Sequence, residues 1–284
     1  MGRAKVADPL WLWVEDLRRL VGWRIRCGAV PRLPAGLRRL TPIRLRDDVR
    51  LRALAVGTGL IPPRTMHSAT DASVLLDLAR DARRAVEIGV YEGASAVLLC
   101  ETLRSDAELH LVDPFGRHLD ALPSGWGATE WATRRVVARA LHARKRRRGA
   151  GGRGASRGEA GGRGEAGGNG EAGGHETGAP AVYWHICLSA DLARDWRGEV
   201  DLVFIDGDHS ESGCELDWSS WQGFVPLGGH VVFHDARAGR PGGRGLPGPT
   251  AVVDRHFRSS GRDYEPDWEI VAEADRTVAV SRTR

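Results

Sequence analysis

The sequence predicts an α/β fold with a seven-stranded, mostly parallel sheet, helices on both faces and a C-terminal antiparallel hairpin. Three observations carry this prediction. Short apolar runs alternate with helical stretches from residue 85 onwards. Two of these runs, 200–205 and 229–233, end abruptly in carboxylates and imidazoles. The last two strand-like segments are joined by a few residues around Asp275, so one of them must run antiparallel.

The expected elements follow one another in a regular βα order. The predicted strands cover residues 85–89, 108–112, 182–186, 200–205, 229–233, 268–272 and 277–280. The predicted helices cover residues 72–84, 94–104, 129–143 and 214–221. In open parallel sheets ligands bind beyond the carboxyl ends of the strands, so the polar residues that follow these runs are the candidate site.

Two segments do not follow this pattern, and they suggest a two-part chain. Residues 1–64 form a basic extension in which 10–26 can make an amphipathic helix, and we favour a helical cap over a membrane-surface or partner-binding helix. Residues 65–284 form the main domain, interrupted by a Gly-rich stretch at 144–178. That stretch repeats the unit GEAGGx three times and lacks apolar residues, so we interpret it as a disordered insertion.

Charge and composition argue against several functional classes. The chain has a net charge of +4, but residues 1–60 carry +8 and residues 144–178 carry +4, which leaves −8 for the remainder. The presumed catalytic part is therefore acidic, and nucleic-acid binding is disfavoured. No apolar run is long enough for a membrane span, and there is no signal-peptide pattern. The four cysteines lack CxxC spacing, so we expect free thiols in a cytoplasmic protein.

The loop after the first strand predicts a ligand-binding turn. Glu87, Gly89 and Gly93 follow an E-x-G-x-x-x-G spacing that opens a helix. Glycines let backbone approach a ligand closely, and a helix N-terminus supplies free N–H groups. The spacing differs from the dinucleotide fingerprint, and the alternative is an ordinary tight turn.

Two further residues support a cofactor site. Asp113 directly follows the second strand, where a carboxylate can accept both hydroxyls of a ribose. Taken alone, Asp113 could equally cap a helix. Ser189 follows the third strand, where it would lie beside an adenine.

The segments EIGVYEGAS, LVDPFG, DLVFIDGDHSESGCELDWSSW and PLGGHVVFHDA together resemble the class I S-adenosylmethionine-dependent methyltransferases. More closely, they are similar to the DGDHS-type methyltransferase-24 group, which is related to macrocin-type and catechol O-methyltransferases. The resemblance covers roughly residues 65–143 and 179–284. It implies a Rossmann-like sheet, with Glu87, Gly89 and Gly93 at the methionine end of the cofactor, Asp113 at the ribose and Ser189 near the adenine.

The resemblance also implies a metal position. In metal-dependent relatives an acid after strand four and two residues after strand five bind Mg²⁺, and this chain has Asp206, His234 and Asp235 there. His234 departs from the pattern because imidazole is a poor partner for a hard cation. Three options stay open: a metal-free site, a softer divalent cation such as Mn²⁺, and a Mg²⁺ site with more water.

The base is predicted to be His209, three residues after Asp206. A neutral imidazole can take a hydroxyl proton near pH 7. His234 is the alternative base if no metal binds. The structural alternative for His209 is that it only caps and packs at the start of a helix. Asp208 either orients His209 or caps the following helix.

Two further groups of residues lie near these positions in the sequence. Trp218 and Trp221 are three residues apart and are expected to pack inward. Arg237, Arg240 and Arg244 lie in or beside a Gly/Pro-rich loop, where they either grip an anionic substrate or are simply solvated.

These residues predict a cytoplasmic O-methyltransferase that uses S-adenosyl-L-methionine to methylate a hydroxyl of a sugar-bearing or polyol secondary metabolite. The alternatives are the same fold with a hydroxylase-related or lost activity, an RNA methyltransferase that uses the basic N-terminus, and a non-enzymatic scaffold that contacts membranes through residues 9–26. Formation of a homo-oligomer is left open.

Overall fold

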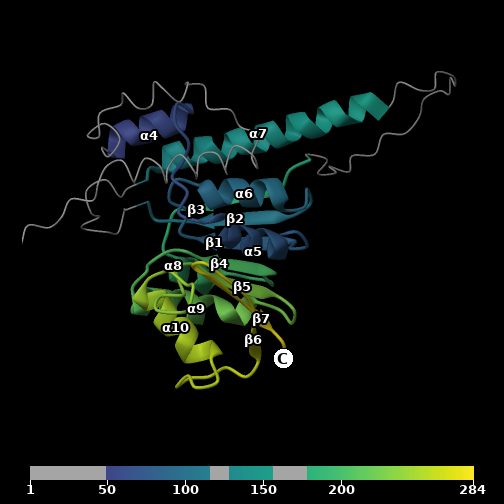
Figure 1. Cartoon of the computed structure of the whole chain (residues 1–284). Helices are drawn as coiled ribbons and strands as arrows, with labels where there is room; N and C mark the ends of the chain where they lie inside the picture. Colours follow the sequence, from purple (N-terminus) through teal and green to yellow (C-terminus); the bar gives the residue numbers. More distant parts are fainter. Residues whose placement is uncertain (1–48, 116–127, 156–177) are drawn as a thin grey trace, which may run out of the picture.

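A seven-stranded sheet forms the centre of the molecule in the computed structural model, which describes residues 49–115, 128–155 and 178–284 (Figure 1). The strands are β1 (Arg84–Ile88), β2 (Glu108–Val112), β3 (Ala181–His185), β4 (Leu202–Ile205), β5 (His230–Phe233), β6 (Trp268–Ala274) and β7 (Thr277–Arg282). Their order is β3-β2-β1-β4-β5-β7-β6. Strands β1 to β5 are parallel, and β7 is antiparallel to both β5 and β6, which confirms the predicted sheet.

The ends of the central strands lie level with one another. Ile88 of β1 pairs with Ile205 of β4, which in turn pairs with Phe233 of β5. The backbone hydrogen bonds continue one residue beyond the strands. The backbone N–H of Asp206 donates to the carbonyl of Ile88 at 2.9 Å, and the backbone N–H of His234 donates to that of Ile205 at 3.0 Å. The polar residues that follow β1, β4 and β5 therefore meet at one edge of the sheet.

Helices cover both faces of the sheet (Figure 1). One face carries α5 (Ala69–Ala79), α6 (Ala94–Thr102) and α7 (Glu130–Ala155), with α4 (Val49–Thr58) packed on α7. The other face carries α8 (Ser189–Asp195), α9 (Glu211–Trp221) and α10 (Pro247–Phe257), and the short 3₁₀ helix η1 (Gln222–Phe224) follows α9. Helices α8 and α10 were not predicted from the sequence, whereas α4 lies within residues 1–64, which were predicted to form a helical cap.

Alternating residues of each strand build two apolar layers. In β4, Val203 and Ile205 pack towards α8–α10, whereas Leu202 and Phe204 pack towards α5–α7. Trp218 and Trp221 of α9 are fully buried in the first layer, as their spacing predicted. Each buried side chain of this size contributes about 1.5–3 kcal/mol of transfer free energy.

Helix α7 runs further than predicted. It was expected to end at residue 143 but continues to Ala155, so its C-terminal part extends beyond the sheet (Figure 1). Arg144 explains the continuation. Its guanidinium is buried and donates to the carbonyls of Cys100, of Leu103 at 2.6 Å and of Gly178 at 3.1 Å. The predicted insertion at 144–178 thus begins as helix, while residues 156–177 and the predicted helix 10–26 lie outside the described residues.

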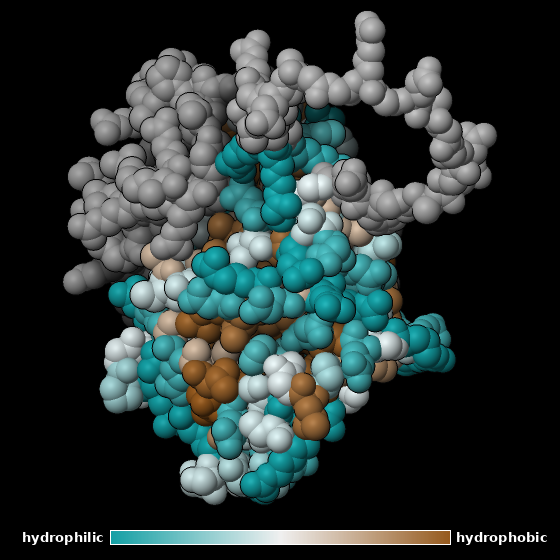
Figure 2. All heavy atoms as spheres, turned by 90° about the vertical axis from the view of Figure 1, so that its right-hand side faces the viewer, coloured by the Kyte–Doolittle hydropathy of each residue, from teal (hydrophilic) through white to brown (hydrophobic). Residues whose placement is uncertain are grey.

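In the part of the chain that the structure describes, none of the helices combines the length and the apolar character needed to cross a bilayer. Figure 2 shows apolar side chains on one face in several separate patches between hydrophilic ones.

Candidate active site

The loop between β1 and α6 passes directly over the end of β4. Gly89 has a φ of 86°, and a Cβ atom there would lie 2.2 Å from the carbonyl oxygen of Asp206. Only glycine fits this left-handed position against another backbone. Gly93 has a φ of 82° and is the N-cap of α6. Gly89 therefore brings the loop against Asp206, whereas Gly93 lies against side chains of α7.

Asp113 ties this loop to the end of β2. Its Oδ2 atom accepts from the backbone N–H groups of Val90 and Tyr91 at 2.9 and 2.8 Å, and its Oδ1 atom accepts from that of Phe115 at 2.6 Å. Burial raises the pKa of Asp113, and these three N–H groups offset part of that shift. A carboxylate offers about four acceptor sites, so room for a ribose hydroxyl remains.

Two buried carboxyl groups flank the same loop. Glu87 is fully buried, accepts from the hydroxyl of Ser95, and has a pKa raised to about 8 by burial. Glu92 pairs with the guanidinium of Arg52, whose Nη2 atom lies 2.7 Å from Oε2, and accepts from the backbone N–H of Arg64 at 2.6 Å. Helix α4 is thereby fastened to the loop, a contact that no sequence motif indicated.

Ser189 begins α8 and is buried. Its hydroxyl donates to Asp217 on α9, and burial raises the pKa of that carboxyl to about 6. A Cβ atom at Gly207 would lie 3.2 Å from Asp217, so this pair sits behind the strand end that carries Asp206.

Four predicted residues meet beyond β4 and β5. Asp206 Oδ1 lies 2.9 Å from His234 Nδ1 and 3.3 Å from His209 Nε2. His209 Nε2 also lies 3.4 Å from Asp235 Oδ2. The His234 ring is 1% exposed, whereas the His209 side chain is 35% exposed, so His209 is the member that faces outward.

The charges in this cluster support one another. Burial raises the pKa of Asp206, but the imidazoles around it, His234 foremost, hold it well below its usual value. Burial lowers the pKa of His209 and of His234, but the carboxylates of Asp206 and Asp235 outweigh that effect and raise both.

Two residues of this cluster were missed by sequence reasoning. His67, in the connection between α4 and α5, is buried with its Nε2 atom 3.4 Å from Asp206 Oδ2 and its ring centroid 4.3 Å from that of His234. Arg276, in the turn between β6 and β7, donates to Asp235 Oδ1 at 2.9 Å. Neither belongs to a recognisable motif, and only the tertiary fold brings them in.

Asp208 and the three arginines after β5 have partners within the protein. Asp208 accepts from the N–H of Ser210 at 2.8 Å, while Ser210 is the N-cap of α9. The three arginines after β5 all face acids: Arg237 lies 3.2 Å from Glu273, Arg240 pairs with Asp254, and Arg244 lies 3.5 Å from Asp275.

The donor set does not fit Mg²⁺. Asp206, His209, His234 and Asp235 each offer one donor atom, and these atoms lie within 4.8 Å of one another, so the spacing alone would permit an ion. Mg²⁺ requires oxygen ligands in near-octahedral geometry. Here an imidazole stands in place of one carboxylate, and a guanidinium already binds Asp235.

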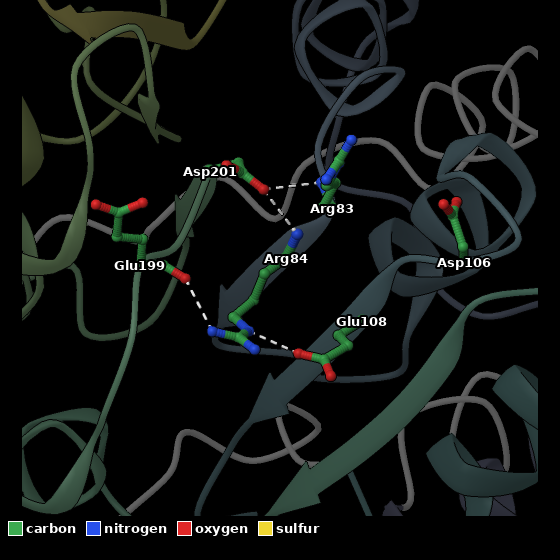
Figure 3. A pocket seen from close by; sticks show the side chains of 6 residues that line it. All are labelled: Arg83, Arg84, Asp106, Glu108, Glu199 and Asp201. Carbon is green, nitrogen blue, oxygen red and sulfur yellow. Dashed lines mark hydrogen bonds and ion pairs between the residues drawn. The ribbon is translucent and has the colours of Figure 1, made fainter.

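A hollow lies at the other end of the sheet, at the starts of β1, β2 and β4 (Figure 3). There Asp201 accepts from the backbone N–H groups of Arg83 and Arg84 at 2.8 and 2.9 Å. The Arg84 guanidinium binds Glu108 at 2.6 Å and the carbonyl of Glu199 at 3.2 Å. These contacts brace the strand starts, far from the cluster at the carboxyl ends.

Comparison with known proteins agrees with this geometry. A family model described as a methyltransferase domain, Methyltransf_24, matches residues 86–236, a little over half of the chain. The O-methyltransferase NovP is 13% identical, with 95% of this chain and 99% of NovP covered and a TM-score of 0.50. The O-methyltransferase TomG from Streptomyces achromogenes, solved with SAM, is 18% identical, with 82% and 88% covered and a TM-score of 0.46.

An O-methyltransferase from Bacillus cereus, solved with SAH, is 14% identical, with 86% and 93% covered and a TM-score of 0.45. At 13% identity, the likeness to NovP concerns the fold alone. The family match is more specific, because it spans the Gly loop, Asp113 and the cluster beyond β4 and β5. This chain therefore belongs to the methyltransferase-24 group of class I S-adenosylmethionine-dependent methyltransferases.

Proposed function

We propose that the protein is an S-adenosylmethionine-dependent O-methyltransferase that acts on a hydroxyl of a small molecule, such as a sugar-bearing or polyol secondary metabolite. One observation supports this most strongly. The loop expected to hold the cofactor touches the strand end that carries the acid–histidine cluster, since a Cβ atom at Gly89 would meet the carbonyl of Asp206. A methyl donor and a deprotonating group would thus lie side by side.

The residues of the loop fit the cofactor. The Oε2 atom of Glu87 is buried without a hydrogen-bond partner among the described residues, which leaves an acceptor for the ammonium group at the methionine end. Gly89 and Gly93 allow close backbone approach, Asp113 keeps an acceptor site for the ribose, and Ser189 would lie near the adenine. The bound cofactor would supply an electrophilic methyl group on a sulfonium.

His209 is the proposed base. Its Nε2 atom faces Asp206 and Asp235, so the ring donates there and leaves the Nδ1 lone pair for the acceptor hydroxyl. Nδ1 would take the proton of the acceptor hydroxyl as its oxygen accepts the methyl group, which the bound cofactor would supply from its sulfonium, leaving a thioether. Asp206 orients His209 and stabilises its protonated form. Alignment of oxygen, carbon and sulfur supplies much of the acceleration.

Calorimetry with S-adenosylmethionine tests the cofactor half of this proposal, and absence of binding would eliminate it. A screen of sugars, glycosides and polyols with methyl-labelled cofactor tests the acceptor half. Label transferred to RNA but to no small molecule would favour a nucleic-acid methyltransferase instead.

A further inference from the structure

Arg276 is fixed in the active site by its own backbone. Its N–H donates to Asp71 Oδ1 at 2.8 Å, and its carbonyl accepts from the N–H of Ala236 at 2.7 Å. The guanidinium, one-quarter exposed, donates to Asp235 Oδ1 at 2.9 Å. A flexible surface arginine would not be held at three points, so this one has a defined position beside Asp235.

Asp71, which accepts the backbone N–H of Arg276, is connected to the same site. Asp71 lies in the first turn of α5, where it accepts from the N–H of Ser68 at 2.9 Å as part of a capping box. Ser68 directly follows His67, whose ring packs against that of His234. The start of α5, the β6–β7 turn and the acid–histidine cluster therefore form one hydrogen-bonded unit.

The other carboxylate is also occupied by protein donors. Asp206 Oδ1 lies 2.9 Å from Nδ1 of the buried His234 ring, a normal hydrogen-bond distance. A ring nitrogen that donates its N–H has no lone pair to offer a metal ion. This holds for the charged ring and for the neutral tautomer that carries its proton on Nδ1. The Oδ2 atom faces His67 Nε2 at 3.4 Å.

Electrostatics oppose an added divalent cation here. An ion bound to Asp235 would lie next to the guanidinium of Arg276, which contacts the same carboxylate at 2.9 Å. Like charges at such distances repel strongly in a partly buried site. We propose that Arg276 and the N–H of His234 take the place of the metal ion, so that the acceptor site works without a divalent cation. This proposal rests on the proposed O-methyltransferase function.

Arg276 and His234 act as positioning residues in this arrangement. They hold the carboxylates of Asp235 and Asp206, which in turn hold the Nε2 atom of His209 at 3.4 and 3.3 Å. A fixed imidazole would thus remove the hydroxyl proton without the help of a metal ion. A metal ion would favour acceptors that chelate it, such as vicinal diols. Without a metal ion, we expect substrates with an isolated hydroxyl to be methylated at rates similar to those of vicinal diols.

Metal binding can be measured without any methyl transfer, so its outcome is distinguishable from failure of the proposed function. The full chain is treated with chelator and titrated calorimetrically with MgCl₂, MnCl₂ and ZnCl₂. We expect no stoichiometric binding and no change of Tm on addition of EDTA. Binding of any of these ions in a 1:1 ratio with submillimolar Kd would overturn the proposal.

A gain-of-binding variant tests the cause. The double substitution His234→Asp with Arg276→Ala leaves three carboxylates and no guanidinium, and we expect it to bind Mg²⁺ and to show a Tm that rises with Mg²⁺ concentration. Arg244→Ala is the matched control, since that arginine is exposed and faces Asp275 in the neighbouring loop. A folded double variant that does not bind Mg²⁺ would contradict the proposal, because it would show that His234 and Arg276 are not what excludes the ion.

The positioning role has its own readout. We expect Arg276→Ala to lower kcat about 10- to 100-fold, the range typical of residues that orient a catalytic group through another one. Added methylguanidinium should restore part of the activity, and Arg276→Lys should retain more than the alanine variant. Wild-type turnover in Arg276→Ala would overturn the assignment, even if the double variant failed to fold.

Discussion

The two sides of the active site satisfy their carboxylates in different ways. On the cofactor side, Asp113 accepts from three backbone N–H groups of neighbouring loops. On the acceptor side, Asp206 and Asp235 face side chains, namely imidazoles and the guanidinium of Arg276. Backbone donors are set by the path of the chain and cannot be exchanged by mutation. Side-chain donors can be replaced one at a time, so the acceptor side can change its chemistry while the cofactor side stays constant.

The largest effect is expected where the two sides touch. Gly89→Ala places a Cβ atom against the Asp206 carbonyl and forces a left-handed alanine. We expect a loss of about 3–5 kcal/mol in the free energy of unfolding, measured by denaturant titration. Gly228→Ala is the control, because Gly228 has a φ of 77° and no atom within 4 Å of its Cβ position. Equal losses in the two variants would mean that the close approach has no energetic consequence.

Removal of the base should affect the acceptor side alone. We expect His209→Ala to lower kcat about 10²- to 10⁴-fold, because the hydroxyl loses its proton acceptor. The Kd for S-adenosylmethionine, measured by calorimetry, should stay within about twofold, since the cofactor loop keeps its backbone contacts. His142→Ala, on the exposed surface of α7, serves as the control. Unchanged turnover would eliminate His209 as the base.

Asp113→Asn should affect the cofactor side alone. An amide turns an NH₂ group towards at least one of the three N–H groups, which costs about 1–3 kcal/mol. We therefore expect cofactor affinity to fall about 10-fold or more, while kcat at saturating cofactor changes little. Calorimetry and steady-state kinetics separate the two effects. A selective fall in kcat would show that the two sides are not independent.

The smallest effect is expected at Asp217, which has a single side-chain donor and therefore contrasts with Asp113. Burial raises its pKa to about 6 from 3.8. Above pH 6 the buried carboxyl is ionised, which lowers the stability of the folded state. Below pH 4 it is protonated in both the folded and the unfolded state, so this loss of stability is absent. Asp217→Asn should therefore increase the free energy of unfolding by about 1–2 kcal/mol at pH 8 and by almost nothing at pH 4. Urea titrations at both pH values measure this. A gain that is independent of pH would point to packing instead of charge.

Much of the fold follows from local sequence patterns. The seven strands and the terminal hairpin were predictable because each strand is a short apolar run with a polar or glycine boundary. The Gly loop and Asp113 were predictable for the same reason, since their spacing along the chain reflects a local turn. The residues after β4 and β5 could be placed together because adjacent parallel strands end at the same edge.

The rest depends on contacts between distant segments. His67 and Arg276 lie 139 and 70 positions from Asp206, in connections whose path no periodicity indicates. The Arg52–Glu92 ion pair could not be predicted either, because nothing in the sequence distinguishes Arg52 from the many other arginines. The extension of α7 was missed because Gly-rich sequence disfavours helix, while the buried contacts of Arg144 favour it.

The contacts of Arg144 also bear on how this gene can change in length. One guanidinium joins the end of α6 to Gly178, the residue from which the chain enters β3. The start of β3 is thus anchored independently of how many residues separate positions 155 and 178. We expect repeat expansion and contraction there to be nearly neutral, which makes this the natural site for inserting a tag or a fused domain.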